Sequence, residues 1–221
     1  PGLGGAFCRL EDNTVLMVAT DGHRLAKVST HSGIETTVSE GIIIPPKALN
    51  NLARLIGESE VPPQFTIGEN HIVFELEQTT LYSRLIEATF PDYERVIPTG
   101  NKKLISINRE ALQSAVRRVA VLSNATTRQI RFSIKPGFVE LSASSHDIGG
   151  EAKEEVPAVY DGEPLDTAYD YRYILDVLER VECDDVTFQL DTAVSAGLIV
   201  PAEQSEYDDY VCLIMPLRLT D

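Results

Sequence analysis

Three side chains that could move protons or bind anions lie close together in the segment Thr20-Asp21-Gly22-His23-Arg24. A carboxylate, an imidazole and a guanidinium could form an acid–base site, so one hypothesis is an enzyme of unknown type with its site at the Asp21, His23 and Arg24 loop. Asp-Gly is also a favoured turn dipeptide, because glycine takes positive φ at little cost. The competing interpretation is a polar turn that the Asp21 side chain stabilises.

The remaining sequence gives catalysis little support. The four histidines are scattered without a His-x-x-x-His pair, and no glycine-rich phosphate-binding motif is present. Cys8, Cys183 and Cys212 lie far apart and show no Cys-x-x-Cys spacing, which favours neither a disulfide framework nor a zinc site. We therefore expect no catalytic residue, no metal and no cofactor, and a reducing cytoplasm as the location.

The composition is typical of a globular protein. The 221 residues are 43% hydrophobic and 24% charged, and no apolar run approaches the roughly 20 residues of a membrane helix. The net charge of −15 argues against a broad basic surface for nucleic acid. Any contact with DNA must therefore use a local face that is poor in acid.

The loop at Asp21 requires two strands to present it. Apolar residues alternate before it at Leu16 and Val18 and after it at Leu25 and Val28, as in a β-hairpin. The pattern predicts that Thr20, His23 and Arg24 lie at the tip of this hairpin.

A repeat of about sixty residues organises the longer chain. Units begin at Ile42, Leu104 and Leu165, and each is predicted to contain a strand, a helix and three further strands; in the last unit these three are expected at 186–190, 193–200 and 210–216. Residues 1–41 resemble the end of another such unit, so we expect the chain to be a fragment. Since paired units form one domain, the predicted domains are 1–99 and 100–221.

The three expected helices carry the same apolar stripe at helical spacing. Asn108 and Asp170 are predicted N-caps, Pro45-Pro46 starts the first helix and Gly57 ends it. The residues predicted to face the sheets are Leu49, Leu52, Ala53 and Ile56, then Leu112, Ala115, Val116 and Val119, then Ile174, Val177, Leu178 and Val181.

The opposite faces of the first two helices are poor in acid. They carry Lys47, Arg54 and Arg117 among polar residues, whereas the third helix departs from the trend with Asp176 and Glu179. One interpretation is a solvated surface. The other is a surface that tolerates a DNA phosphate backbone without reading bases.

The C-terminal segment 210–219 is almost wholly apolar and contains Pro216, which must interrupt a strand ladder. Residues 210–214 could simply be a core strand. That interpretation does not explain Met215 to Leu219, which cannot all pair in a strand, so these residues are a candidate rim of a groove.

Three segments together resemble a known family. Ala19-Thr20-Asp21-Gly22-His23-Arg24-Leu25, Phe90-Pro91-Asp92-Tyr93-Glu94-Arg95-Val96 and Met215-Pro216-Leu217-Arg218-Leu219 are similar to motifs of the beta sliding clamps of bacterial DNA polymerase III. The resemblance covers essentially the whole chain and matches most of the second clamp domain and all of the third.

The resemblance implies an α+β DNA-clamp fold with helices on one face of antiparallel sheets. It also implies a processivity factor that is not an enzyme, whose full-length parent is a homodimer closing as a ring around duplex DNA without sequence preference. Its implied partners are the DNA polymerase III catalytic subunit, the clamp loader, other polymerases and repair proteins. No membrane is implied.

In this family, partners dock through short linear motifs rich in glutamine, leucine and phenylalanine. The peptide-binding residues that the resemblance implies here are Leu3, Thr20, Gly22, His23, Arg24, Leu25, Pro91, Arg95, Val96, Tyr173, Ser195, Leu213, Ile214, Met215, Pro216, Leu217 and Arg218. Ser195 is matched less closely, because the final hairpin around 200–207 is longer here. Val121 and Leu122 match residues at the subunit interface.

Overall fold

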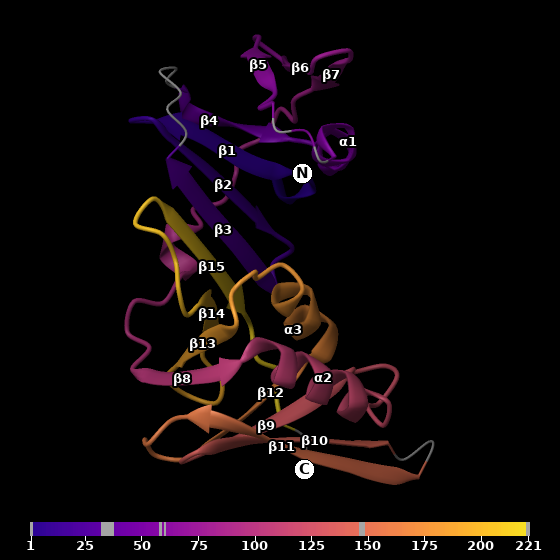
Figure 1. Cartoon of the computed structure of the whole chain (residues 1–221), viewed down its shortest axis with the longest axis vertical. Coiled ribbons are helices and arrows are strands. Elements are labelled where there is room, and N and C mark those ends of the chain that lie inside the picture. Colours follow the sequence, from indigo (N-terminus) through magenta and orange to yellow (C-terminus); the bar gives the residue numbers. More distant parts are fainter. Residues whose placement is uncertain (1, 32–37, 58, 60, 146–148, 220–221) are drawn as a thin grey trace. The chain divides into compact units, whose positions relative to one another are not determined.

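The computed structural model describes residues 2–31, 38–57, 59, 61–145 and 149–219. Its elements follow the predicted order (Figure 1). A short 3-10 helix η1 (Gly2–Gly4) and strands β1 (Ala6–Glu11), β2 (Thr14–Thr20) and β3 (Arg24–His31) come first. The first repeat comprises β4 (Val38–Ile44), α1 (Pro46–Ile56), β5 (Gln64–Ile67), β6 (His71–Glu75) and β7 (Thr80–Arg84). The second comprises β8 (Lys103–Asn108), α2 (Arg109–Ala120), β9 (Gln129–Lys135), β10 (Phe138–Ser145) and β11 (Gly150–Val159). The third comprises β12 (Leu165–Asp170), α3 (Tyr171–Leu178), β13 (Asp185–Leu190), β14 (Gly197–Pro201) and β15 (Asp208–Ile214). A second 3-10 helix, η2 (Glu94–Val96), precedes β8.

The chain divides into two compact units. The first contains the residues up to Gly22, then Lys27–Tyr93 and Tyr207–Asp209, and the second contains His23–Ala26, Glu94–Glu206 and the residues from Tyr210 onward. The division into compact units places Tyr93 in the first unit and Glu94 in the second. The domain boundary after residue 99 stays a prediction.

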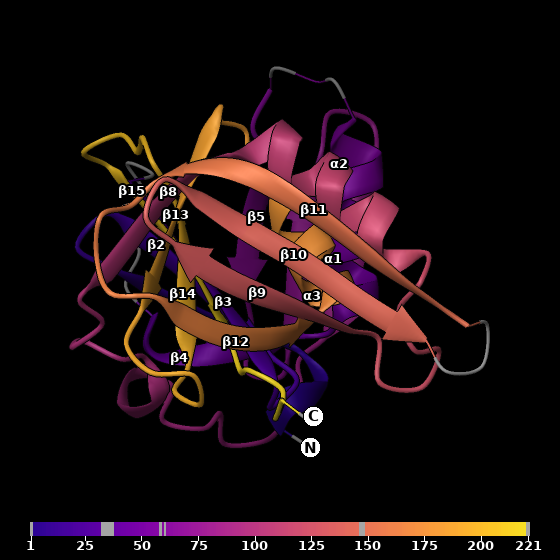
Figure 2. The same ribbon diagram turned by 90° about the horizontal axis from the view of Figure 1, so that it is seen from below.

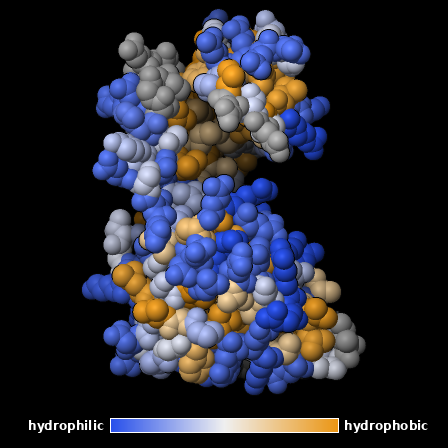
Figure 3. Space-filling view, viewed as in Figure 1, coloured by the Kyte–Doolittle hydropathy of each residue, from blue (hydrophilic) through white to orange (hydrophobic). Residues whose placement is uncertain are grey.

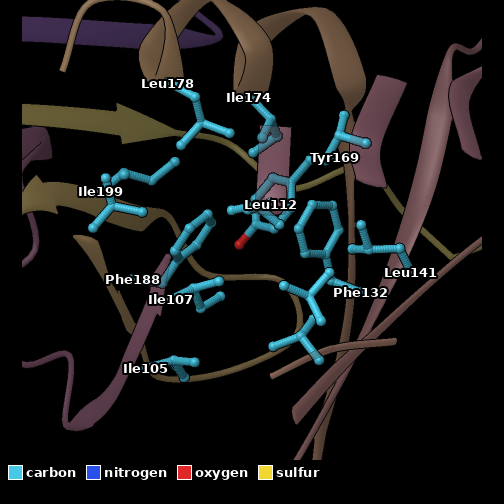
Figure 4. Packing of buried hydrophobic residues seen from close by; sticks show 14 of the residues in the cluster. Ile105, Ile107, Leu112, Phe132, Leu141, Tyr169, Ile174, Leu178, Phe188 and Ile199 are labelled. Carbon is cyan, nitrogen blue, oxygen red and sulfur yellow. The ribbon is translucent and has the colours of Figure 1, made fainter. Parts of the chain in front are cut away.

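The second unit is an antiparallel sheet covered by two helices. Its strand order is β12-β9-β10-β11-β8-β13-β14-β15, and α2 and α3 contact each other. Figure 2 shows β12, β9, β10 and β11 side by side with the helices behind them. The apolar stripes of both helices meet the sheet residues in one core, where Leu112, Phe132 and Ile174 are almost wholly inaccessible to solvent (Figure 4).

Both helices of this unit begin with the expected caps. The Asn108 side-chain oxygen accepts a hydrogen bond from the Ala111 N–H at 3.0 Å, and the Asp170 carboxylate accepts one from the Arg172 N–H at 2.9 Å. Each cap satisfies a helical N–H group that has no partner inside the helix. The two predicted N-caps are therefore confirmed.

The first unit holds the strands β3-β2-β1-β4 in that order and a separate three-stranded sheet β5-β6-β7. Pro46 occupies the first turn of α1, and Gly57 ends the helix at φ 52°, as the sequence predicts. Cys8, Ile44, Ala48, Ile72 and Phe74 form the small core beneath α1.

Several predicted details are wrong. In α1 the buried residue is Ala48, while Ala53 is exposed, because the apolar stripe is rotated by part of a turn. Val28 is 38% exposed and so leaves the alternation of β3. Residues 193–196 form a turn before β14, so this strand starts at Gly197 and not at 193. Val181 is buried as predicted, but it lies beyond the end of α3.

Candidate functional site

The centre of the candidate site is an arginine that lies over a tyrosine ring. Arg24 is the first residue of β3, and its guanidinium carbon lies 4.3 Å from the centroid of the Tyr173 ring. Its Nη1 donates a hydrogen bond to Asp176 Oδ2 at 2.5 Å. Because Tyr173 and Asp176 are three residues apart on α3, they share one helix face and can hold the arginine together.

A second arginine flanks the same ring. The Arg172 guanidinium lies 5.9 Å from the Tyr173 centroid and donates two hydrogen bonds, of 3.1 and 2.6 Å, to the carboxylate of Asp170. Asp170 is only 7% exposed and also caps α3. Each of the two guanidiniums near Tyr173 is therefore matched by its own carboxylate.

The C-terminal segment continues from β15 beside these residues. Leu213 and Ile214 are 4% and 1% exposed and belong to the interior, whereas Met215 is 42% exposed. The Met215 N–H donates to the His23 carbonyl at 2.9 Å, and the Leu217 N–H donates to the Ala168 carbonyl at 2.7 Å. Two backbone hydrogen bonds thus hold the segment after β15, which contains Pro216 and does not extend the strand.

Beneath this segment lies a buried thiol. Burial raises the pKa of Cys212 above its usual value, although the bond to Tyr210 and the charge of Arg24 oppose this shift. The Cys212 thiol donates to the Tyr210 hydroxyl oxygen at 3.2 Å. Since burial disfavours the thiolate, Cys212 is a small apolar core residue and not a nucleophile.

Ser195 lies in a turn fixed by reciprocal hydrogen bonds with Thr192. The Thr192 N–H donates to Ser195 Oγ at 3.0 Å, and the Ser195 N–H donates to Thr192 Oγ1 at 3.1 Å. The serine hydroxyl is therefore used to set the backbone of the turn that precedes β14.

Four of the predicted peptide-binding residues belong to the first unit: Leu3, Thr20, Gly22 and Pro91. Leu3 is 44% exposed on η1, and Pro91 is exposed. Thr20 Oγ1 accepts a hydrogen bond from the Gly22 N–H at 3.1 Å, so this threonine stabilises the turn. Gly22 has φ 88°, a conformation that favours glycine.

The segment 90–96 combines anchoring and exposed residues. In the first unit Phe90 stacks on Phe7 with ring centroids 5.2 Å apart, and Tyr93 is 8% exposed. Arg95 and Val96 follow in η2 of the second unit, where Val96 is 56% exposed. The aromatic residues of the motif thus fix its backbone, and its last two residues face solvent.

The second unit brings part of the predicted set together. A backbone hydrogen bond links His23 to Met215, and a cation–π contact links Arg24 to Tyr173, while Leu25 is 3% exposed and forms part of the interior. Pro216 and Leu217 are half-buried, and Arg218 is exposed. The site therefore rests on buried side chains, those of Leu25, Leu213 and Ile214. Met215 gives it an exposed apolar side chain.

The residues expected to face DNA differ in their surroundings. Lys47 and Arg54 are exposed on α1. Arg117 on α2 is also exposed, but its Nη2 donates to Glu179 Oε1 at 2.8 Å, so part of its charge is compensated. At the end of α2, Val121 is 72% exposed and Leu122 is half-buried.

Sequence reasoning missed three residues that organise this site: Asp176, Asp170 as a partner of Arg172, and Thr192. Asp176 was assigned only to an outward helix face, and its partner Arg24 is 152 residues away. Its spacing of three residues from Tyr173 was the available signal, because such residues are neighbours on a helix.

No group of three or more metal-ligating side chains occurs in the described ranges. No described helix has the length and apolarity to cross a bilayer. On the face in Figure 3, apolar residues gather in small patches among hydrophilic ones. The cytoplasmic location stays a prediction.

A repeated strand–helix–three-strand chain with helices over antiparallel sheets is the DNA-clamp class of α+β fold, which confirms the predicted fold class. The family model for the DNA polymerase III beta subunit central domain matches residues 1–92, and the one for its C-terminal domain matches residues 94–218. The chain therefore belongs to the DNA polymerase III beta subunit family.

Named relatives agree with this assignment. The chain is 35% identical to the beta sliding clamp of Pseudomonas aeruginosa and 38% identical to that of Haemophilus influenzae, in each case over 98% of this chain and 58% of the relative. A crystal structure of the P. aeruginosa DNA polymerase sliding clamp with ligand has a TM-score of 0.92 at 35% identity, covering 98% of this chain and 58% of that one. The chain thus spans 58% of the length of these relatives.

Proposed function

We propose that this chain is part of a DNA sliding clamp, a processivity factor that tethers a replicative polymerase and other partners to duplex DNA. The observation that carries the proposal is the match of two successive beta-subunit domains, in order, over nearly the whole chain. In this role the protein catalyses no reaction: it holds DNA by enclosure within the parent ring. Its partners are the DNA polymerase III catalytic subunit, the clamp loader, other polymerases and repair proteins.

We further propose that partners bind through short peptide segments at the candidate site. The exposed apolar side chains of Val96 and Met215 suit leucine or aromatic side chains of a ligand, and methionine adapts its shape to different partners. A P. aeruginosa clamp of the same fold has been solved bound to griselimycin, which supports ligand binding in this family. His23, Arg24 and Arg95 would supply polar contacts around the apolar ones.

The enzyme hypothesis at Asp21, His23 and Arg24 is not favoured by the family assignment. Arg24 is held against Tyr173 by Asp176, which suits a binding surface. His23 contributes its carbonyl to the Met215 N–H. These contacts support a role of the loop in recognition.

Titration of a labelled peptide that contains the glutamine, leucine and phenylalanine motif tests the proposal. We expect saturable binding that an unlabelled copy of the peptide displaces. A scrambled peptide of identical composition is the matched control, because it preserves charge and hydrophobicity. Equal binding of the motif and scrambled peptides would refute the proposed docking site.

DNA contact by this chain is expected to be weak and independent of sequence. Lys47, Arg54 and Arg117 can neutralise only a few phosphates, and Arg117 is already paired with Glu179. If about three phosphate contacts are neutralised, the apparent association constant should fall about 40-fold from 50 to 200 mM salt. Fluorescence anisotropy with two unrelated duplexes measures this; tight binding that distinguishes the duplexes would contradict it.

The proposal extends to assembly. Val121 and Leu122 are proposed to contact another subunit in the homodimeric parent ring, since an exposed valine after a helix is an apolar surface that a partner can cover. Their position beyond the last turn of α2 leaves both side chains outside the core stripe of that helix.

A further inference from the structure

The positive charge of Arg24, which lies over the Tyr173 ring, could affect which ligands the site binds. Arg24 is an obvious anchor for an acidic ligand group, because a guanidinium is always charged and binds carboxylates well. In this protein, however, Asp176 on α3 already accepts a hydrogen bond from its Nη1. A ligand carboxylate would have to compete with an intramolecular one.

The second arginine shows the same arrangement. Arg172 approaches the Tyr173 ring, and Asp170 accepts two hydrogen bonds from its guanidinium. Tyr173 is thus accompanied by two arginines and two carboxylates. The net charge of these four charged groups is zero, and each guanidinium beside the aromatic ring has a carboxylate partner.

We propose that Asp176 is a positioning residue of the peptide site: it holds Arg24 over the Tyr173 ring and offsets its charge, so that the site selects apolar and aromatic side chains without favouring acidic peptides. This inference rests on the proposed peptide-binding function. Asp176 acts through Arg24 and need not touch the ligand.

The ion pair is suited to positioning more than to stability. The side chains of Arg24 and Asp176 are 34% and 56% exposed, and ion pairs at such sites contribute little to folding. The cation–π contact with Tyr173 holds the guanidinium over the ring, while the hydrogen bond to Asp176 restrains one of its nitrogens. Asp176→Asn should therefore change recognition while leaving the fold intact.

The first measurement needs no ligand. The Tyr173 ring current should displace the NMR signals of the Arg24 side chain, which Arg24→Lys identifies by their disappearance. We expect Asp176→Asn to reduce this displacement by at least about half, because the weaker amide acceptor lets Arg24 leave the ring. The matched control is Asp166→Asn, which removes the carboxylate from the Arg131–Asp166 pair of similar exposure on β9 and β12. An unchanged Arg24 signal in Asp176→Asn would overturn the positioning role.

The second measurement compares two peptides that differ only by a Gln-to-Glu change beside the leucine. The wild-type protein should bind both within about twofold, whereas Asp176→Asn should favour the acidic peptide by about threefold or more at low salt, an advantage that disappears in high salt. Asp166→Asn should keep the wild-type ratio. An unchanged ratio in Asp176→Asn would overturn the inference about selectivity.

The two measurements separate the inference from the function on which it rests. If the wild-type protein binds neither peptide, the proposed docking function fails, while the Arg24 signals still decide whether Asp176 positions that side chain. If the wild-type protein binds both peptides and Asp176→Asn behaves like Asp166→Asn, the docking function stands and the role of Asp176 is refuted.

Discussion

Ending the chain after Ile214 should weaken binding of the motif peptide by at least about tenfold, or about 1.4 kcal/mol, while the fold is retained. The truncation removes Met215, an exposed apolar side chain, together with Leu217, whose N–H is held by the Ala168 carbonyl. It leaves the pairing of Gly197 with Ile214 and of Leu198 with Leu213 in place. The interior strand therefore survives, and the loss falls on the proposed binding surface.

Titration of the labelled peptide against both proteins measures the effect, and circular dichroism verifies the fold of the truncated one. Leu104→Ala is the control, because Leu104 is a 55% exposed apolar residue on β8 outside the proposed site. Its affinity should match the wild type within about twofold. Undiminished affinity in a folded truncation would remove residues 215–219 from the site.

The helices and their caps could be predicted because their causes are local. Apolar residues that recur every three or four positions lie on one face of a helix, as Leu112, Val116 and Val119 do on α2. Asn108 forms its cap bond with a residue three positions away. The repetition of one pattern in three units then made the element order predictable.

Contacts between distant segments could not be predicted in the same way. Arg24 and Asp176 are 152 residues apart, and nothing in a single sequence pairs one arginine with one of many aspartates. The burial of Leu25, Leu213 and Ile214 beneath the site is a similar case, because apolar residues in a binding surface and in a core have the same composition.

The rotated stripe of α1 has a simpler cause. Alanine is small enough to be accepted either in a core or at a surface, so Ala48 and Ala53 are equivalent in the sequence pattern. Packing against the first unit's small core decides that Ala48 is buried. Large apolar residues leave less freedom: α2 has the whole predicted stripe, and α3 has it as far as its last residue, Leu178.

Phe132→Ala should have the largest effect on stability, a loss of about 3–5 kcal/mol in the free energy of unfolding of the second unit. Phe132 is 2% exposed on β9. Its ring meets Tyr169 edge-on with 5.4 Å between centroids, and its centroid lies 6.2 Å from that of Phe188. Figure 4 shows the three side chains in the core. Removing it deletes a large apolar side chain and leaves a cavity between two rings that the sheet holds apart.

Urea denaturation followed by tyrosine fluorescence and circular dichroism measures this loss. Val159→Ala is the matched control, since Val159 lies on β11 in the same unit and is 77% exposed; its effect should stay within about 0.5 kcal/mol. Phe132→Leu should fall between the two, because leucine refills most of the space. Tyr169 directly precedes the capping residue Asp170 of α3, so the cavity should also loosen the start of the helix that carries Tyr173. A loss below about 1 kcal/mol in Phe132→Ala would mean that Tyr169 and Phe188 close over the missing ring, contrary to the rigid aromatic packing inferred here.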